Sequence, residues 1–373
     1  MKKFGLFVLI FSLIAISLII VKGIVPLSVA DNLPQSTEKS NLSNVSSYSY
    51  YYVSQFGTRG SGDCQFEGPM GIAVDPSGYI YVSDWWNSNI QKFDSNGKFI
   101  TKWGGGGPKS PIQTPQGIAF DSSGNLYIAE TWKNRIRKVN SNGESLGFLG
   151  NKEAISLGVK LIGHGQFKAP WGIAIDHSGN IYITDTGHNI VQKFNSEGVF
   201  ITQWGTKGIN DGQFNSLSFV AADSAGNIYV ADSLNNRIQK FSSDGAFITK
   251  WESSGKANGQ FNQPEGIAVD KSNNVYVVDK KNNRVQVFNS NGTFINKFGT
   301  GGSGPGQFGY PNGIAVDASG NIFISDYGNY RVQIFKYGIP PMGSPNLPVK
   351  DINNFPMKMP GMKIPGPKPG INQ

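Results

Sequence analysis

The strongest constraint on the fold is a unit of close to 47 residues that recurs along the chain. Each unit contains a short apolar run that ends in aspartate. These aspartates are Asp75, Asp121, Asp176, Asp223, Asp270 and Asp317, at successive spacings of 46, 55, 47, 47 and 47 residues. A repeat of this length is typical of propellers and solenoids, in which each unit buries its apolar face against its neighbours. The chain is therefore predicted to contain six such units.

Within a unit, four short apolar runs alternate with turn sequences. In the first unit the runs are residues 72–74, 80–83, 90–93 and 99–103, and the breaks between them are rich in Asp, Asn, Ser and Gly. Such runs predict short strands, and such breaks predict turns. Four short strands per unit make one blade of a β-propeller. A β-helix is the structural alternative, but its coils are much shorter than these units.

The ends of the repeat array predict how the ring closes. The sixth unit ends at residue 337 without a fourth run, whereas residues 51–57, ahead of the first unit, resemble the fourth runs of the other units. We expect this N-terminal strand to complete the last blade and so remove the open edge of the ring. The predicted fold is an all-β, six-bladed β-propeller of four-stranded blades over residues 51–337.

The repeats resemble the NHL repeat. The fullest match is residues 259–288, with Gly-Gln-Phe, then Pro-Glu-Gly-Ile-Ala-Val-Asp, Val-Tyr-Val-Val-Asp and finally Asn-Asn-Arg-Val-Gln-Val-Phe. The resemblance implies a propeller but no single function, because NHL propellers serve as RNA binders, sensor ectodomains, lyases and adaptors. The ubiquitin-ligase role of some members needs a separate RING domain, which a chain with one cysteine cannot build.

The net charge of +8 does not predict a nucleic-acid partner. Residues 51–337 carry 25 Lys and Arg against 22 Asp and Glu, so most of the surplus lies in the two ends of the chain. A protein that neutralises phosphates needs a concentrated basic surface. We expect no nucleic acid among the partners, and a monomeric protein.

The N-terminal region predicts export. Residues 4–21 are uncharged and follow Lys2 and Lys3, and Ser28-Val29-Ala30 has the small-x-small form of a cleavage site. Residues 1–30 are therefore interpreted as an apolar helix that is either a signal peptide or a transmembrane anchor. In both cases the remainder lies outside the cytoplasm. The protein is expected on the extracellular side of the cytoplasmic membrane or secreted.

Two further segments flank the propeller. Residues 31–50 are rich in Ser and Asn and are predicted to form a stalk, and residues 338–373 form a Pro-, Gly-, Met- and Lys-rich tail that we expect to be disordered. Candidate glycosylation sites are Asn41 and Asn44 in the stalk and Asn291 in a turn.

One face of the predicted ring is the better candidate for binding. The turns between first and second strands are short and uniform, and we call their side the turn face. The turns between second and third strands and the connections between blades lie on the opposite side, the loop face, and they vary. Its candidate ligand-binding residues are Trp85, Trp86, Trp132, Lys133, Trp171, Lys280, Lys281, Tyr310, Tyr327 and Tyr330. Packing between blades is the alternative role for the aromatic residues among them.

The residue before each inner-strand glycine is predicted to point at the mouth of the central channel. Gln116, Glu265 and Asn312 occupy three of these positions and carry oxygen ligands suited to a hard cation. They support an alternative function, a metal-dependent hydrolase or lyase at the channel mouth.

The sequence contains no recognisable triad of Ser, His and acid, so our preferred interpretation is not an enzyme. We expect an exported, non-catalytic binding module for a protein, peptide or glycan, without catalytic residues, metal or cofactor. The second alternative is a structural component of the cell surface.

Overall fold

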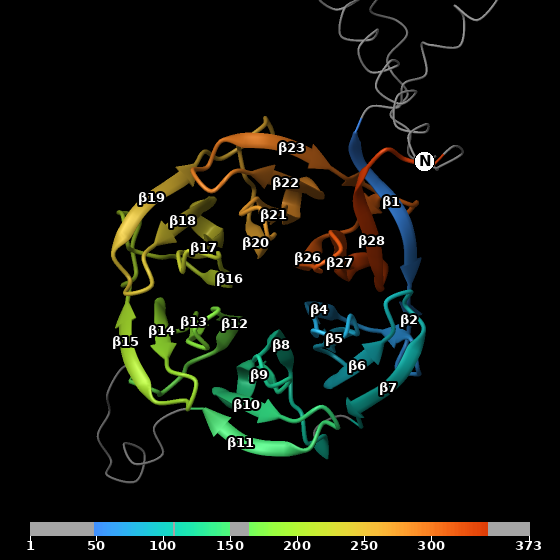
Figure 1. Cartoon of the computed structure of the whole chain (residues 1–373), viewed down its shortest axis with the longest axis horizontal. Helices are drawn as coiled ribbons and strands as arrows, with labels where there is room; N and C mark the ends of the chain where they lie inside the picture. The colour runs from blue at the N-terminus through green and yellow to red at the C-terminus, as the bar shows by residue number, and fades with distance from the viewer. Residues whose placement is uncertain (1–47, 107–108, 150–163, 342–373) are drawn as a thin grey trace, which may run out of the picture. The chain divides into compact units, whose positions relative to one another are not determined.

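The computed structural model describes residues 48–106, 109–149 and 164–341. Over these residues the chain forms six four-stranded antiparallel sheets that surround one axis as blades (Figure 1). The blades are numbered here by their order in the sequence. The predicted six-bladed, all-β propeller is confirmed. The predicted N-terminal helix, most of the stalk and the tail from residue 342 lie outside the described residues.

Each blade runs from an innermost first strand to an outermost fourth strand. The first strands are β4 (Pro69–Val74), β8 (Pro115–Phe120), β12 (Pro170–Ile175), β16 (Leu217–Ala222), β20 (Pro264–Val269) and β26 (Pro311–Val316). The second strands are β5 (Ile80–Asp84), β9 (Leu126–Glu130), β13 (Ile181–Asp185), β17 (Ile228–Asp232), β21 (Val275–Asp279) and β27 (Asn321–Asp326).

The third strands are β6 (Asn89–Phe93), β10 (Arg135–Val139), β14 (Ile190–Phe194), β18 (Arg237–Phe241), β22 (Arg284–Phe288) and β28 (Arg331–Gly338). The outer strands are β7 (Phe99–Gly104), β11 (Ser145–Leu149), β15 (Phe200–Trp204), β19 (Phe247–Glu252), β23 (Phe294–Phe298) and, for the last blade, β1 (Ser49–Phe56).

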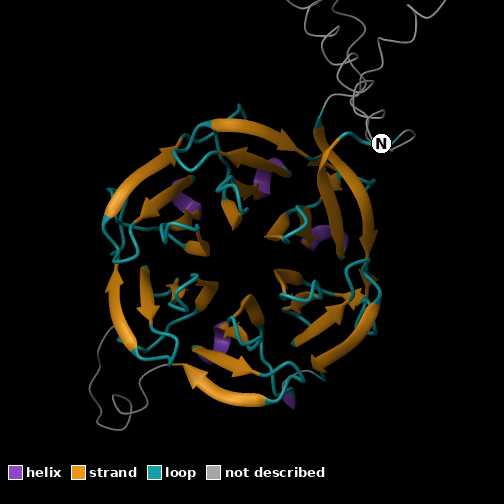
Figure 2. Ribbon diagram, in the orientation of Figure 1, coloured by secondary structure: helices purple, strands orange, loops and turns teal. Residues whose placement is uncertain are grey.

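Smaller elements lie between these strands. Two short parallel pairs occur in connections between blades, β2 (Thr58–Arg59) with β3 (Gln65–Phe66) and β24 (Thr300–Gly301) with β25 (Gln307–Phe308). Single turns of 3₁₀ helix follow four of the second strands and are purple in Figure 2. They are η5 (Thr131–Lys133), η6 (Ser233–Asn235), η7 (Lys280–Asn282) and η8 (Tyr327–Asn329). Within the described ranges, no helix has the length and apolar character needed to cross a bilayer.

The ring closes as predicted. Strand β1 pairs antiparallel with β28, so that Ser49 lies opposite Gly338 and Phe56 lies opposite Val332. The side chain of Gln55 adds a further contact, because its Oε1 accepts a hydrogen bond from Arg331 at 2.8 Å. The N-terminal strand thus supplies the fourth strand that the sixth unit lacks.

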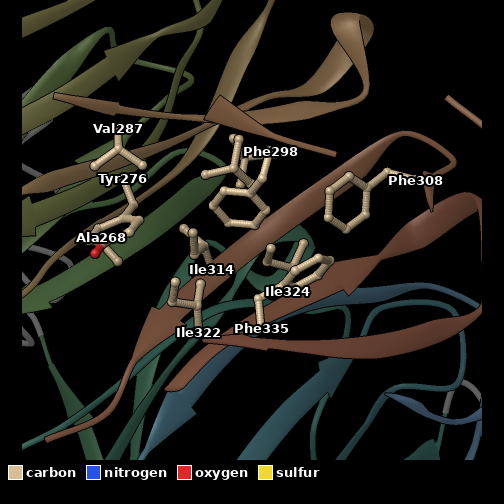
Figure 3. Close-up of a cluster of buried hydrophobic side chains, with 11 residues drawn as sticks. Ala268, Tyr276, Val287, Phe298, Phe308, Ile314, Ile322, Ile324 and Phe335 are labelled. Carbon is tan, nitrogen blue, oxygen red and sulfur yellow. The ribbon is translucent and has the colours of Figure 1, made fainter. Parts of the chain in front are cut away.

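The hydrophobic core is divided into six clusters, each shared by two neighbouring blades. Figure 3 shows the cluster between blades 5 and 6, where Tyr276 and Phe298 of one blade pack with Ile314 and Phe335 of the next. Alternate residues of each strand therefore point toward opposite neighbours, as the period of a β-strand requires. The burial of these apolar side chains holds the blades together.

Tryptophans on three of the outer strands pack against the following blade. Trp103, Trp204 and Trp251 each cover a glycine in the third-to-fourth turn of the following blade. At Gly245, for example, an added Cβ atom would lie 2.6 Å from the ring of Trp204, and the backbone φ is +86°. These tryptophans therefore pack one blade against the next.

Candidate functional site

The loop face is built on a buried acid at the end of each second strand. In blade 5, Asp279 accepts hydrogen bonds from Arg284 Nε at 2.7 Å and from the backbone N–H of Asn262 at 2.8 Å. The same Arg284 donates to the carbonyl oxygens of Lys256, Ala257 and Gln260. Blades 4 and 6 repeat the ion pair with Arg237–Asp232 and Arg331–Asp326. Burial raises the pKa of Asp279, and the hydrogen bonds from Asn262, Asn282 and Arg284 oppose that rise.

These hydrogen bonds give the acids a structural role. Each Asp–Arg pair joins the second and third strands of one blade. The guanidinium groups fix the loop that enters the blade, because their remaining N–H groups satisfy its carbonyl oxygens. They are therefore not free to act on a ligand.

In three blades the residue after the acid bonds to the next blade. In blades 2, 3 and 4 it carries a hydroxyl, and this group donates to a carbonyl on the following inner strand. The pairs are Thr131 with Pro170 at 2.8 Å, Thr186 with Leu217 at 2.7 Å and Ser233 with Pro264 at 2.6 Å. In the other three blades the position holds Trp85, Lys280 or Tyr327 instead. At this end of the channel, blades 2, 3 and 4 therefore carry hydroxyl side chains, whereas blades 5, 6 and 1 carry larger side chains.

All six inner strands have a β-bulge at this end. In blade 1, Pro69 pairs with Asp84 and Ile72 with Val82, so Met70 and Gly71 together face the single residue Ser83. The glycine is required by close approach, since a Cβ atom at Gly71 would lie 2.3 Å from the carbonyl oxygen of Gln116 in the next blade. Bulges of this kind re-aim side chains next to functional sites.

The residues before these glycines, which we call the channel-mouth residues, form a ring because consecutive inner strands are neighbours. They are Met70, Gln116, Trp171, Ser218, Glu265 and Asn312. Five of them are buried, with Gln116 0% and Asn312 1% exposed, and Trp171 is half-buried. The three polar residues that the sequence singled out are thus placed at one level of the fold.

Several polar atoms at this level have no hydrogen-bond partner among the described residues. They are Trp85 Nε1, Gln116 Nε2, Gln116 Oε1, Trp171 Nε1, Glu265 Oε2 and Asn312 Oδ1. A buried polar atom without a partner costs about 1–3 kcal/mol. By contrast, the equally buried Gln239 of blade 4 uses both amide atoms, since Oε1 accepts from Gly212 at 2.9 Å and Nε2 donates to Gln213 at 2.8 Å. The channel mouth on the loop face therefore contains buried donors and acceptors that no described residue satisfies.

Glu265 is the one acidic side chain in this ring. Its Oε1 lies 3.3 Å from Nζ of Lys280, which is the first residue of η7 in the same blade. Burial raises the pKa of Glu265, and the charge of Lys280 together with the Ser218 hydroxyl opposes that rise. The carboxyl group is thus held next to a cation in a site largely shielded from water.

Four of the predicted aromatic residues form a continuous arc across blades 2, 1 and 6. The ring of Trp85 lies 5.8 Å from that of Trp132 and 4.8 Å from that of Trp86. The indole Nε1 of Trp86 then donates to the phenol oxygen of Tyr327 at 3.1 Å. Trp86 is 53% and Trp132 65% exposed. These four residues, the aromatic arc, present flat apolar surface beside the channel mouth.

The remaining predicted residues are more scattered. Lys133, Lys281 and Tyr310 are exposed on the loop face. Tyr330 lies under the guanidinium of Arg59, with Arg59 Cζ 4.9 Å from the ring centre. Asn291 is exposed in a turn, and Asn41 and Asn44 lie outside the described residues.

The turn face contains a feature that the sequence analysis did not predict. Two cavities, of about 510 Å³ and 400 Å³, are lined by residues of the first-to-second turns and share Val316, Asp317 and Ala318. The aspartates around them are already engaged. Asp75 Oδ1, for instance, accepts the backbone N–H groups of Ser77 and Tyr79, both at 2.9 Å. Uniform turns gave no signal for a cavity, because the hollow arises only where six of them meet.

A metal at the channel mouth has limited support from the donor atoms. Within residues 48–106, 109–149 and 164–341, no three side chains of His, Cys, Asp or Glu gather closely enough to hold an ion. Glu265, Gln116 and Asn312 offer one unpartnered oxygen each, but unpartnered N–H groups of Gln116, Trp85 and Trp171 occur at the same end. N–H donors do not fit around a cation.

Comparison with known proteins supports the reading of the repeats. A family model described as the NHL repeat matches residues 66–93, 167–194, 214–241, 261–288 and 308–335. Each matched segment begins and ends with phenylalanine, and in blade 5 the rings of Phe261 and Phe288 lie 5.5 Å apart. Blade 2 has Ile112 and Val139 at these positions, both buried in the cluster it shares with blade 1. Blade 2 therefore has the same fold with two aliphatic residues in place of the two phenylalanines.

Individual relatives share the repeat or the fold. Protein lin-41 of Caenorhabditis elegans is 47% identical over 47 residues, which is 13% of this chain and 4% of that protein. A streptogramin B lyase structure gives a TM-score of 0.54 at 15% identity and covers 78% of this chain and 98% of its own. A gluconolactonase from Xanthomonas campestris gives 0.56 at 15% identity, covering 74% and 88%. At these identities the solved structures show a common fold.

The two enzymes contradict our expectation that the chain is not an enzyme. That expectation relied on the lack of a recognisable triad of Ser, His and acid in the sequence. Propellers of the same fold include a lyase and a gluconolactonase, so the missing sequence motif does not exclude catalysis.

Proposed function

Because the chain is a six-bladed β-propeller that carries NHL repeats, we propose that it binds a ligand at the loop-face end of its central channel. The observation that carries this proposal is the set of buried, unpartnered polar atoms of Gln116, Glu265 and Asn312 at one level of the ring. A fold seldom leaves such atoms unsatisfied without a functional reason. The aromatic arc beside them supplies contact area of the kind found at binding sites.

The proposal can be tested without knowing the ligand. If Gln116 is kept for binding, Gln116→Met removes two unsatisfied polar atoms, and the unfolding free energy should stay the same or rise. The matched variant Gln239→Met removes a fully bonded amide at equal burial and should cost about 1–3 kcal/mol. Urea unfolding of the full chain measures both. A loss at Gln116 equal to the loss at Gln239 would assign Gln116 a structural role and contradict the proposal.

We further propose that this binding takes place outside the cell, with residues 1–30 serving as a signal peptide or membrane anchor. The uncharged run at residues 4–21 after Lys2 and Lys3 supports export. The partner is then an extracellular protein, peptide or glycan. Fractionation of cells that express the full chain, with protease added to intact cells, tests the location. Protection of the propeller from the protease in intact cells, followed by cleavage after lysis, would contradict it.

Chemical conversion of the ligand is the second candidate function. Glu265 favours it, because a carboxyl group with a raised pKa next to Lys280 is suited to accept or donate a proton. Hydrolysis and elimination both include a proton transfer of this kind, so they are the proposed reaction classes. Turnover of a panel of lactones and esters, lost in Glu265→Gln while binding persists, would support this function. Equal turnover by the variant would exclude Glu265 from the reaction.

A further inference from the structure

The balance of donors and acceptors at the channel mouth indicates the chemistry of the ligand. The unpartnered donors are the N–H groups of Trp85, Trp171 and the Gln116 amide, and the unpartnered acceptors are oxygens of Gln116, Glu265 and Asn312. Both kinds are therefore present, as three donor nitrogen atoms and three acceptor oxygen atoms. A ligand that satisfies both kinds must itself donate and accept hydrogen bonds. A hydroxyl group does both through one atom.

The positions of these atoms form a ring. Gln116 and Trp171 belong to the neighbouring blades 2 and 3, and Glu265 and Asn312 belong to the neighbouring blades 5 and 6. Trp85 of blade 1 follows the acid at the end of β5, the position at which Thr131 and Ser233 bond the inner strand of the next blade. A compact molecule with several polar groups around its edge fits this arrangement. An extended peptide presents only one N–H and one C=O about every 3.3 Å along its length.

The aromatic arc adds an apolar surface at one side of this ring. Trp85 belongs to both features, because its ring packs against Trp86 and Trp132 while its Nε1 is among the unpartnered donors. The single buried carboxylate is balanced by Lys280 at 3.3 Å, so the site contains no unpaired charge that would select an ion. A ligand with an apolar face and a polar rim is therefore favoured over a strongly charged one.

We propose that the ligand is a neutral carbohydrate, bound with hydroxyl groups toward Gln116, Glu265 and Asn312 and with the C–H face of a sugar ring against the aromatic arc. This inference rests on the proposed function and names its ligand class. Sugar hydroxyls supply donors and acceptors together, and sugar rings supply apolar C–H faces. Binding also satisfies polar atoms that otherwise weaken the fold.

The alternatives account for fewer of the observations. A divalent cation would use the three oxygens but leave the three donor nitrogen atoms unsatisfied. An anion would use the N–H donors but place its charge next to Glu265, whose Oε2 has no partner among the described residues. Either ligand would therefore leave half of the unpartnered polar atoms without a hydrogen-bond partner.

The test uses the full-length chain on an array of neutral oligosaccharides, with acidic oligosaccharides and a peptide library printed beside them. The best neutral hit is then titrated by calorimetry against the unaltered protein, Trp86→Ala, Gln116→Met and the control Trp251→Ala, which alters a packing tryptophan of the outer strand β19. We expect a neutral oligosaccharide to bind, with at least tenfold weaker affinity for Trp86→Ala and for Gln116→Met and unchanged affinity for folded Trp251→Ala. Calcium chloride is titrated separately into chelator-treated protein.

Four outcomes would overturn the carbohydrate assignment. The first is binding of peptides alone with loss in Gln116→Met, and the second is stoichiometric Ca²⁺ binding lost in Glu265→Gln. Both would leave the proposed binding site in place. The third is neutral-sugar binding that neither Trp86→Ala nor Gln116→Met weakens, because the sugar would then lie elsewhere. No binding to the array, together with strong destabilisation by Gln116→Met, would overturn the proposed function as well.

Discussion

The indole Nε1 of Trp86 donates a hydrogen bond to the phenol oxygen of Tyr327 at 3.1 Å, although 241 positions separate the two residues in the chain. The bond joins the first and last blades on the loop face. Gly68 lies beneath it, and an added Cβ atom there would be 2.6 Å from Trp86 and 3.4 Å from Tyr327. The aromatic arc is thus assembled across the point where the ring closes.

Trp86→Ala is expected to change stability little. The side chain is half-exposed, so the loss of unfolding free energy should be about 1 kcal/mol or less. Trp251→Ala, at a buried outer-strand position, should cost about 3–5 kcal/mol. Urea unfolding of both variants makes the comparison. Similar losses would show that Trp86 is a packing residue and would weaken the case for the arc as a binding surface.

Glu265→Gln is expected to alter how stability depends on pH. Burial raises the pKa of Glu265 in the folded protein above its ordinary value near 4.5, so the unfolded chain releases this proton at lower pH. The unaltered protein should therefore lose stability relative to Glu265→Gln as the pH rises above that value.

The control is Glu67, whose pKa is lowered by its hydrogen bond with Arg59. The stability that Glu67 contributes is present above its ordinary pKa and is lost as the pH falls, so Glu67→Gln should show the opposite trend. Urea unfolding from pH 3 to 8 measures all three proteins. A parallel pH profile for Glu265→Gln and the unaltered protein would contradict the assigned direction.

Gly245→Ala and Gly226→Ala separate backbone strain from blade packing. Both glycines have positive φ, +86° and +79°, so alanine should cost about 1–2 kcal/mol at either position. Only at Gly245 would the added Cβ atom also meet Trp204, at 2.6 Å. Gly245→Ala should therefore be the more destabilising change, and thermal unfolding gives the ranking. Equal losses would mean that Trp204 moves aside at no cost.

Phe56→Ala is expected to weaken the closure of the ring. Phe56 is buried, its ring lies 4.5 Å from that of Phe93 in blade 1, and a Cβ atom at Gly97 would lie 2.3 Å from it. The loss should be about 3–5 kcal/mol. Val53→Ala in the same strand is the control, because Val53 is 48% exposed and should change stability by about 0.5 kcal/mol. Denaturant unfolding distinguishes the two, and equal effects would show that β1 closes the ring through its backbone alone.

Most of the fold could be predicted because its signals are local. The turn sequences after Asp75 and its equivalents, the alternation of apolar residues, and the missing fourth strand of the last unit are all visible in the chain order. The structure confirms each, including the pairing of β1 with β28.

The candidate site could be predicted only in part. Gln239 has equivalents in four other blades and is fully bonded, whereas Gln116 lies at a position that varies and its amide atoms have no partner among the described residues. The sequence distinguishes a repeated position from a variable one, which is why Gln116, Glu265 and Asn312 could be singled out. It does not indicate which amide finds a partner, because that depends on atoms from neighbouring blades. The cavities of the turn face have the same origin.

The pairing of Ser49 with Gly338 has a mechanical consequence. The two chain segments that flank the propeller leave it from the same end of the same pair of strands. The bonds of an antiparallel ladder run perpendicular to its strands, so a force that separates the two flanks loads those bonds one at a time, starting at Ser49. Under tension the ring should therefore open at β1 by peeling, at a lower force than an arrangement in which all rungs share the load.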